Sequence, residues 1–269
     1  MRQYLGQHFL KRGPIGSMIV DALKIGPRDV VVEIGPGHGE LTDLLLGKKP
    51  LRIICVERDD KLASMLQERY SGNPSVSVLS EDILKALPRF AGGRERGGGS
   101  IKHPWKLMGN IPYYLTGKLL RVVGELPAKP LRSVLTIQKE VAERLIAQPP
   151  RMNRLAASVQ HWANPRIVRI VPRSEFIPPP EVDSAIVEFT ANEAVPAPAH
   201  KGYSRAIRIL FKQPRKTILN NILESARGLK KSKTELVEIL ARSHIDPSGR
   251  PGNLSLEDIA ALSVLLFRE

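Results

Sequence analysis

The 269-residue sequence contains a single cysteine, Cys55, so neither a disulfide within the chain nor a cysteine-based metal site can form. It has no apolar run of membrane-spanning length and no secretory signal pattern, so we expect a cytoplasmic protein with no membrane partner. Acidic residues are scarce as well, since 27 Asp and Glu stand against 41 Lys and Arg. The composition is therefore that of a globular protein with an ordinary apolar content and a strong positive charge.

The missing acids are concentrated in two segments. No Asp or Glu occurs in residues 144–174, which hold six arginines, or in residues 194–223. A basic proteome would raise the charge evenly, whereas clustering is typical of a protein that binds a polyanion. The formal net charge of +14 therefore predicts a nucleic-acid partner.

Three glycines, Gly35, Gly37 and Gly39, follow a short apolar run and precede a helical pattern. This order is typical of a buried strand, a tight turn and a helix, the first half of a βαβ unit. The dinucleotide fingerprint G-x-G-x-x-G fails because Glu40 stands at its last glycine. Glu33 supplies a carboxylate for a ligand with positive groups, and the loop resembles that of S-adenosylmethionine-dependent methyltransferases. A glycine turn with no ligand is the alternative.

Two acids follow the next two expected strands, residues 51–56 and 76–79. Glu57 can accept hydrogen bonds from both ribose hydroxyls of an adenosine group, which nicotinamide cofactors and S-adenosylmethionine share. Asp82 can accept a hydrogen bond from an adenine amine, or it can simply cap the following helix. Together these acids indicate a pocket for an adenosyl ligand.

Asn110, Pro112 and Tyr113 follow an expected strand at residues 105–108. Ligands bind at this carboxyl edge in open α/β sheets. A planar amine is a poor nucleophile, and two acceptors, the Asn110 side-chain oxygen and a nearby backbone carbonyl, would aim its lone pair at a methyl group. Tyr113 offers a face on which a base can stack, and Pro112 stiffens the turn. An ordinary Asn-x-Pro turn is the alternative.

Phe176 precedes three prolines in a segment that reads as a stiff, extended loop. Its ring could face Tyr113 across a pocket and complete a sandwich around a base. It could instead anchor the loop in the core, as isolated aromatics do.

Strand patterns end before residues 191–199, which have the composition of a linker. Four helices are expected beyond it, at residues 203–211, 217–226, 234–241 and 256–267. The cations at the start of this region could be solvated, but the lack of acids favours phosphate binding.

Taken together, these stretches resemble the rRNA adenine dimethyltransferases, which modify two adjacent adenosines near the 3′ end of small-subunit rRNA. The resemblance covers nearly the whole chain and rests on residues 5–10, 33–39, 81–84, 110–116, 138–145, 176–184 and 210–217. It implies an α/β fold, with a Rossmann-like seven-stranded class I methyltransferase domain and a smaller all-helical C-terminal domain. The expected boundaries are residues 1–190 for the first domain, 191–201 for a linker and 202–269 for the helical RNA-binding domain.

The residue patterns and the resemblance together indicate functional residues, and the resemblance itself places cofactor contacts at His8, Leu10, Gly35, Glu57, Asp82 and Asn110. The catalytic set comprises Asn110, Pro112, Tyr113 and Phe176. Contacts to S-adenosylmethionine are expected from Gln7, His8, Leu10, Glu33, Gly35, Gly37, Gly39, Glu57, Asp82, Ile83 and Asn110. RNA contacts are expected from Arg144, Arg154, Arg208, Lys212, Arg215 and Lys216. The N-terminal arm, residues 1–15, should close over the active site, and no metal is needed for the reaction.

Two departures from the family pattern are local. His8 stands where members usually have asparagine, and residues 214–215 are Pro-Arg where two arginines are usual. Two rival functions stay open: a large-subunit rRNA adenine methyltransferase of the macrolide-resistance type, and a non-catalytic ribosome-assembly factor. The sequence favours a monomer that methylates small-subunit rRNA within a pre-ribosomal subunit.

Overall fold

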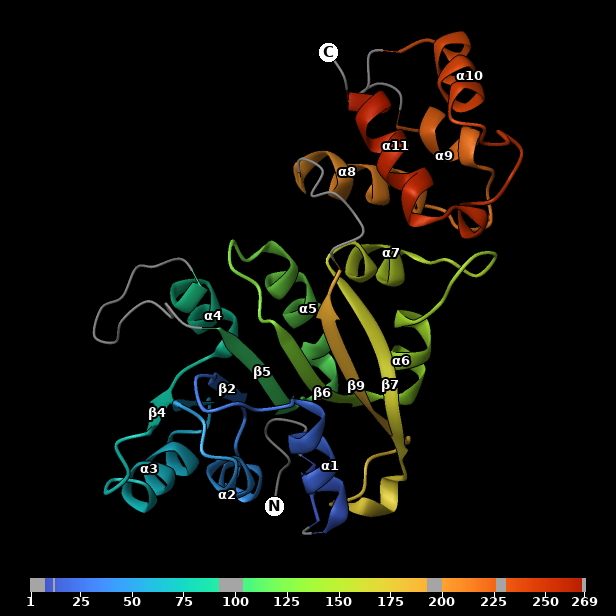
Figure 1. Ribbon diagram of the computed structural model, residues 1–269. Coiled ribbons are helices and arrows are strands. Elements are labelled where there is room, and N and C mark those ends of the chain that lie inside the picture. The colour runs from blue at the N-terminus through green and yellow to red at the C-terminus, as the bar shows by residue number, and fades with distance from the viewer. Residues whose placement is uncertain (1–7, 12, 92–103, 193–199, 226–230, 268–269) are drawn as a thin grey trace. The chain divides into compact units, whose positions relative to one another are not determined.

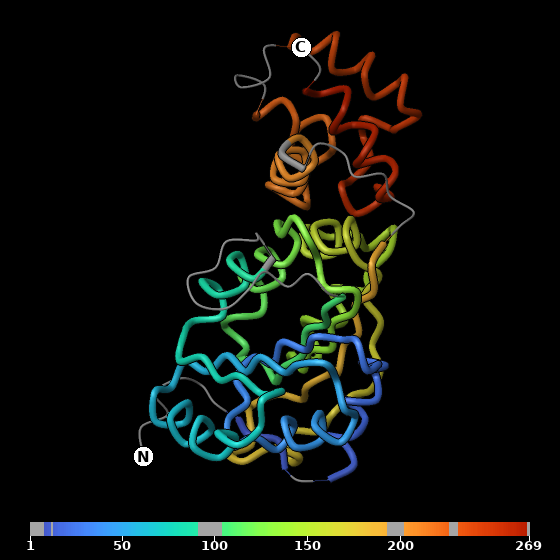
Figure 2. Tube along the Cα trace, turned by 60° about the vertical axis from the view of Figure 1, so that its left-hand side comes forward, coloured from blue at the N-terminus to red at the C-terminus, as the bar shows by residue number. Residues whose placement is uncertain are grey.

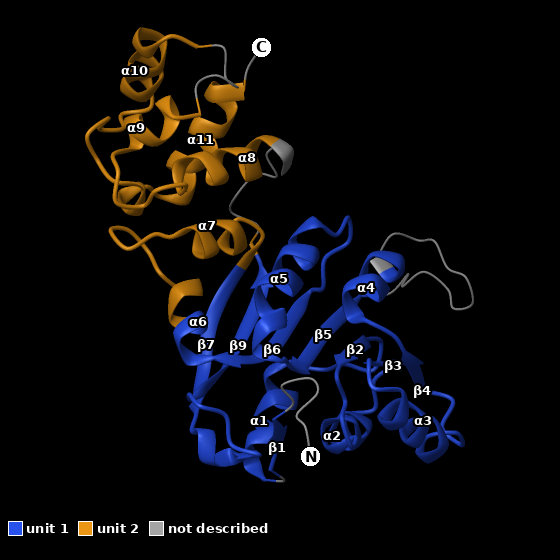
Figure 3. Cartoon of the chain, turned by 180° about the vertical axis from the view of Figure 1, so that it is seen from behind, with its two compact units in different colours: residues 1–142, 164–191 blue, residues 143–163, 192–269 orange. Residues whose placement is uncertain are grey.

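The computed structural model describes residues 8–11, 13–91, 104–192, 200–225 and 231–267 (Figure 1). Gln7, the whole glycine-rich segment 92–102 and residues 193–199 of the expected linker lie outside these residues. Two compact units form: one comprises residues 1–142 and 164–191, and the other residues 143–163 and 192–269 (Figure 3). No helix among the described residues is long and apolar enough to cross a membrane.

The first unit is built on a seven-stranded sheet in the order β4-β3-β2-β5-β6-β9-β7. The strands are β2 Val30–Ile34, β3 Arg52–Glu57, β4 Val76–Ser80, β5 Trp105–Asn110, β6 Arg132–Gln138, β7 Ala163–Val171 and β9 Ser184–Ala191. Strands β4, β3, β2, β5 and β6 run parallel, and β9 runs antiparallel to β6. Strand β3 lies on one side of β2, and β5 lies on the other side of β2. The strand order therefore reverses at β2, and such a reversal opens a crevice between the carboxyl ends of β2 and β5.

Helices cover both faces of this sheet (Figures 1 and 2). They are α1 Pro14–Ala22, α2 Glu40–Gly47, α3 Asp60–Arg69, α4 Ile83–Ala91, α5 Thr116–Glu125 and α6 Lys139–Leu145, with 3-10 turns η1 Tyr113–Leu115 and η2 Arg173–Glu175. Helices α1, α2 and α3 lie on one face, and α4 and α5 lie on the other. The core contains β-branched strand residues such as Val31 and Ile53, packed against Ile19 and Leu45 of the helices. This core fixes the strand ends that carry the site.

A two-stranded sheet ties the N-terminal arm to the rest of the first unit. Strand β1, Phe9–Leu10, pairs antiparallel with β8, Phe176–Ile177. The sequence predicted no regular element in the arm and an extended loop around Phe176. The pairing was missed because it joins short segments that are far apart in the chain, which leave no local periodicity.

The second unit is helical. It contains α7 Arg154–Gln160, α8 His200–Leu210, α9 Ile218–Leu223, α10 Lys233–Arg242, the turn η4 Pro251–Asn253 and α11 Leu256–Phe267. Ser232 and Glu235 form a capping box at α10. Ser255 and Asp258 exchange the same two bonds before α11.

This division differs from the expected boundary at residue 190. Residues 143–163 group with the C-terminal helices because Ala156 and Ala157 are buried in the same core as Leu210. The Tyr203 hydroxyl also donates a hydrogen bond to the Ala157 carbonyl at 3.2 Å. Helix α7 is separated from the C-terminal helices in sequence by β7 and β9, so chain order alone placed it in the wrong unit.

Candidate active site

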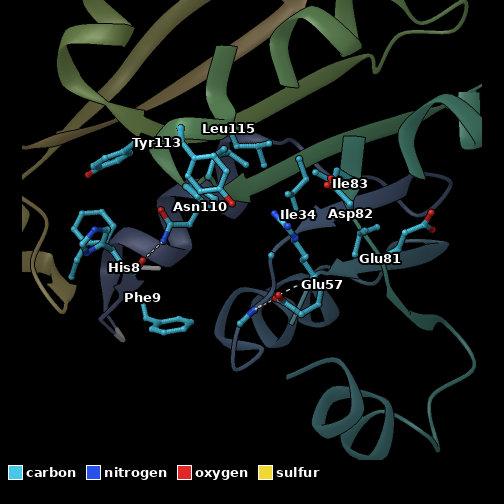
Figure 4. A pocket seen from close by; sticks show the side chains of 18 residues that line it. His8, Phe9, Ile34, Glu57, Glu81, Asp82, Ile83, Asn110, Tyr113 and Leu115 are labelled. Carbon is cyan, nitrogen blue, oxygen red and sulfur yellow. Dashed lines mark hydrogen bonds between the residues drawn. The ribbon is translucent and has the colours of Figure 1, made fainter. Parts of the chain in front are cut away.

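A pocket opens at the carboxyl edge of the sheet, where β2, β3 and β5 end and β4 leads into α4 (Figure 4). The space between its walls is about 860 Å³, open mouth included. Its walls include the predicted residues His8, Gly35, Gly37, Glu57, Asp82, Ile83, Asn110, Pro112, Tyr113 and Phe176. The fold thus brings together residues from six separate stretches of the chain.

The glycine loop supplies the floor. Gly35 and Gly37 have φ values of 60° and 62°, which favour glycine. A Cβ atom on Gly37 would come within 2.9 Å of the Phe9 ring, so glycine also lets the arm pack onto the loop. Gly39 has a φ of 89° but does not line the pocket, and a Cβ there would meet the Tyr70 hydroxyl at 2.6 Å. Gly39 thus serves the entry into α2 and has no surface in the pocket.

Glu57 is held in place by the backbone at the end of β3. Its Oε1 accepts hydrogen bonds from the backbone N–H groups of Arg58 and Asp59 at 2.9 and 3.0 Å, and its Oε2 accepts one from Gly37 at 3.2 Å. The side chain is 3 % exposed. A carboxylate has about four acceptor positions, so this fixed group retains capacity for a ligand hydroxyl.

Asp82 caps the following helix and also lines the pocket. Its Oδ1 accepts a hydrogen bond from the backbone N–H of Leu84 at 2.9 Å, at the start of α4. The residue also lines the pocket, and Oδ2 has no hydrogen-bond partner among the described residues. Capping therefore orients the carboxylate and leaves one oxygen for a ligand amine.

Asn110 ends β5 and is oriented by the arm. Its Nδ2 donates a hydrogen bond to the backbone carbonyl of His8 at 2.6 Å, while its Oδ1 has no partner in the described part of the chain. The preceding Gly109 was not anticipated from the sequence. A Cβ atom there would lie 2.7 Å from the Ile34 carbonyl, so glycine allows β5 to lie against β2 at this point.

Tyr113 is half-buried in the wall, and its hydroxyl shares a hydrogen bond with the Ser184 hydroxyl at 2.9 Å. Burial is the main cause that raises the pKa of this phenol, so it stays neutral. Phe176 lines the pocket but is only 2 % exposed, and it packs in the core of the first unit. It therefore acts as an anchor, and the ring that stacks on Tyr113 in this structure is that of His8, at 5.9 Å between centroids.

Two other expected cofactor contacts lie elsewhere. Leu10 lines a neighbouring hollow between the arm, α1 and α2. Glu33 is 1 % exposed and lines neither cavity, because its side chain points to the α2 face of β2, where Thr42 donates a 2.7 Å hydrogen bond to it. Side chains alternate along a strand, so Ile34 faces the pocket instead. The sequence interpretation overlooked this alternation.

The predicted RNA-contacting cations are exposed, and all six belong to the second unit. Arg144 and Arg154 join the others there because residues 143–163 pack with the C-terminal helices. Lys216 forms an ion pair with Glu224, so part of its charge is neutralised within the unit.

Comparison with known proteins identifies the family to which the chain belongs. A model of the ribosomal RNA adenine dimethylase family matches residues 1–250. The chain belongs to this family. It is therefore an S-adenosylmethionine-dependent rRNA adenine dimethyltransferase, as the sequence motifs predicted.

Sequence relatives match this dimethylase over nearly its whole length. Ribosomal RNA small subunit methyltransferase A from Dehalococcoides mccartyi is 39% identical over 259 residues, which cover 96% of this chain and 85% of that protein. The protein of the same name from Latilactobacillus sakei is 36% identical and covers 97% and 88% of the two chains.

Solved structures show the same fold. A dimethyladenosine transferase from Plasmodium falciparum superposes with a TM-score of 0.77 at 27% identity, over 95% of this chain and 96% of that one. The 23S rRNA methyltransferase ErmE superposes with a TM-score of 0.71 at 23% identity, over 97% and 100%. The second likeness shows the fold alone.

Proposed function

We propose that this dimethylase transfers methyl groups from S-adenosylmethionine to the exocyclic amines of two adjacent adenosines near the 3′ end of small-subunit rRNA. It would act as a cytoplasmic monomer on a pre-ribosomal small subunit. The observation that carries the proposal is the position of Asn110 between two ends of one pocket (Figure 4). Glu57, Asp82 and Ile83 lie on one side of it, and His8 and Tyr113 lie on the other.

The first end fits an adenosyl group. Glu57 would accept from ribose hydroxyls, the free oxygen of Asp82 would accept from the adenine amine, and Ile83 would pack against the ring. Gly35 and Gly37 leave room for the ligand at the floor. When bound, S-adenosylmethionine supplies an electrophilic methyl group on a sulfonium.

The second end suits a flipped-out base. The target adenosine must leave its stack to reach the pocket, where its ring would lie on Tyr113. The hydrogen bond with Ser184 holds that ring still. Pro112 fixes the backbone between Asn110 and Tyr113, so the acceptor and the stacking surface keep their spacing.

Asn110 would hold the amine for transfer. Its Nδ2 is already bound by the His8 carbonyl, so its unpaired Oδ1 is the atom that can accept from the amine. A backbone carbonyl of the following turn would accept the second N–H. These two bonds favour a more pyramidal nitrogen, and catalysis would consist mainly of positioning.

The exposed cations of the second unit would bind rRNA phosphates. Residues 194–223 contain no Asp or Glu, so no carboxylate of this segment would repel a polyanion that approaches Arg208, Lys212 and Arg215.

A large-subunit substrate is the nearest rival, because ErmE shares the fold. The two relatives described above, at 39% and 36% identity, are named as small-subunit methyltransferases, which favours the small subunit. A non-catalytic factor is disfavoured, because the acceptor oxygens of Asp82 and Asn110 are in place.

One experiment separates these functions. Unmethylated small and large ribosomal subunits are incubated separately with the enzyme and radiolabelled S-adenosylmethionine, and the label is mapped by RNA digestion. The proposal expects label at two adjacent adenosines in small-subunit rRNA only. Label in large-subunit rRNA would support the rival enzyme, and RNA binding without label would support the assembly factor.

A further inference from the structure

The connection between α8 and α9 carries three of the cations that are expected to contact rRNA (Figure 1). It contains a four-residue turn, in which the backbone N–H of Lys216 donates a hydrogen bond to the Gln213 carbonyl at 3.0 Å. Pro214 is exposed at the second position of this turn, where its fixed φ suits the common β-turns. Family members usually have arginine at this position, so the chain has a stiffer backbone here in place of a second cation.

A buried carboxamide holds the first residue of this turn. Asn221 of α9 is fully buried, and its Oδ1 accepts a hydrogen bond from the backbone N–H of Gln213 at 2.8 Å. Its Nδ2 donates to the carbonyls of Gln213 and Thr217, at 3.0 Å each. One side chain is thus bonded to both polar groups of the Gln213 backbone. Because a buried amide that loses its partners is costly, the carboxamide and the turn keep one arrangement.

The cations of the turn differ in their partners. Lys216 forms an ion pair with Glu224, whose Oε2 also accepts a 2.8 Å hydrogen bond from Gln213 Nε2. Arg215 is exposed at the third position of the turn and forms no ion pair with any residue that the structure describes. Arg215 is therefore the cation of the turn that is best placed to bind an external anion.

We infer that Pro214 and Asn221 are positioning residues that preform the turn 213–216, so that it presents Arg215 to an rRNA phosphate; this inference rests on the proposed function. A mobile loop loses conformational freedom when it binds a partner, whereas a loop that is already ordered loses little. The restriction by one proline corresponds to roughly a 2- to 5-fold difference in an equilibrium constant. The single arginine of this turn therefore binds a phosphate at a lower entropic cost.

A double-mutant cycle separates this positioning from a general effect on folding. The dissociation constant for unmethylated small ribosomal subunits is measured over a series of KCl concentrations, for wild type, Pro214→Ala, Arg215→Gln and the double variant. Pro214→Ala removes no charge, so we expect roughly 2- to 5-fold weaker binding with the same salt dependence. Arg215→Gln should lower the slope of log K against log salt by about one. In the Arg215→Gln background, Pro214→Ala should cause no further loss.

Two other variants complete the experiment. Pro127→Ala is the matched control, because Pro127 is an exposed proline outside both acid-free segments, and it should bind as wild type does. Asn221→Ala should weaken binding more than Pro214→Ala, again only while Arg215 is present. Thermal melts check the fold of each variant, and Pro214→Ala decides the matter if Asn221→Ala unfolds.

Three results would overturn the inference and leave the labelling of small-subunit rRNA intact. They are equal losses from Pro214→Ala with and without Arg215, an unchanged salt slope in Arg215→Gln, and an equal loss in Pro127→Ala. If the wild-type enzyme labels large-subunit rRNA instead, the proposed function fails, and the same cycle on large subunits decides whether the turn presents Arg215.

Discussion

Burial of Glu33 predicts a pH-dependent stability. The carboxyl is 1 % exposed and accepts hydrogen bonds on Oε2 from Thr42 at 2.7 Å and Cys55 at 3.7 Å. Its Oε1 is buried with no partner among the described residues. The pKa of this carboxyl rises from 4.5 to about 7. The largest cause is the loss of water around the buried group, and repulsion from Asp43 and Glu57 raises the pKa by smaller amounts.

The sign follows from proton linkage. A folded pKa above the unfolded one means that the folded state binds the proton more tightly. The group's contribution to stability is therefore complete below about pH 4.5 and is lost as the pH rises through 7. A difference of about 2.5 between the two pKa values corresponds to about 3 kcal/mol in the free energy of unfolding.

Glu33→Gln is the matched variant, because glutamine has the same shape and does not titrate. Denaturant unfolding of both proteins from pH 5 to pH 8 gives the difference in free energy at each pH. We expect wild type to lose stability relative to the variant by about 3 kcal/mol over this range. Burial also raises the pKa of the Cys55 thiol, which stays protonated throughout. A difference that is constant with pH would refute the reasoning.

Three further substitutions test the site. Asn110→Ala should abolish methyl transfer in the radiolabel assay while S-adenosylhomocysteine binding weakens much less; near-normal turnover would contradict the role of Oδ1. Glu57→Ala should weaken calorimetric binding of that ligand by at least about tenfold, since buried hydrogen bonds are lost; unchanged affinity would count against a ribose contact. Gly39→Ala should lower the thermal midpoint, at a cost of about 1–3 kcal/mol for its positive φ and the close approach to Tyr70; an unchanged midpoint would show that α2 can shift.

The sequence alone predicts those parts of the fold that depend on a local pattern of apolar and turn residues. The strands expected at residues 51–56, 76–79 and 105–108 follow from apolar runs bounded by turn residues, and they are present as β3, β4 and β5. Glu57 and Asn110 could be placed because each ends a parallel strand, and such ends meet at one edge. Each of these inferences uses only one strand and the turn that follows it.

The parts that were missed depend on contacts between distant segments. The pairing of Phe9 with Ile177 and the packing of residues 143–163 with the C-terminal helices have no local signature. Glu33 was misplaced for a different reason. Charge alone suggested a ligand contact, but strand alternation puts Glu33 and Ile34 on opposite faces, and the apolar neighbour faces the pocket.

The arm links the two ends of the pocket through one residue. The His8 carbonyl fixes the amide of Asn110, and the His8 ring faces Tyr113. Because β1 and β8 hold the following two residues, Phe9 and Leu10, in register, the backbone carbonyl of His8 is fixed where Asn110 donates to it. The β1–β8 pairing thus keeps the side chain of Asn110 oriented whatever rotation the His8 ring undergoes.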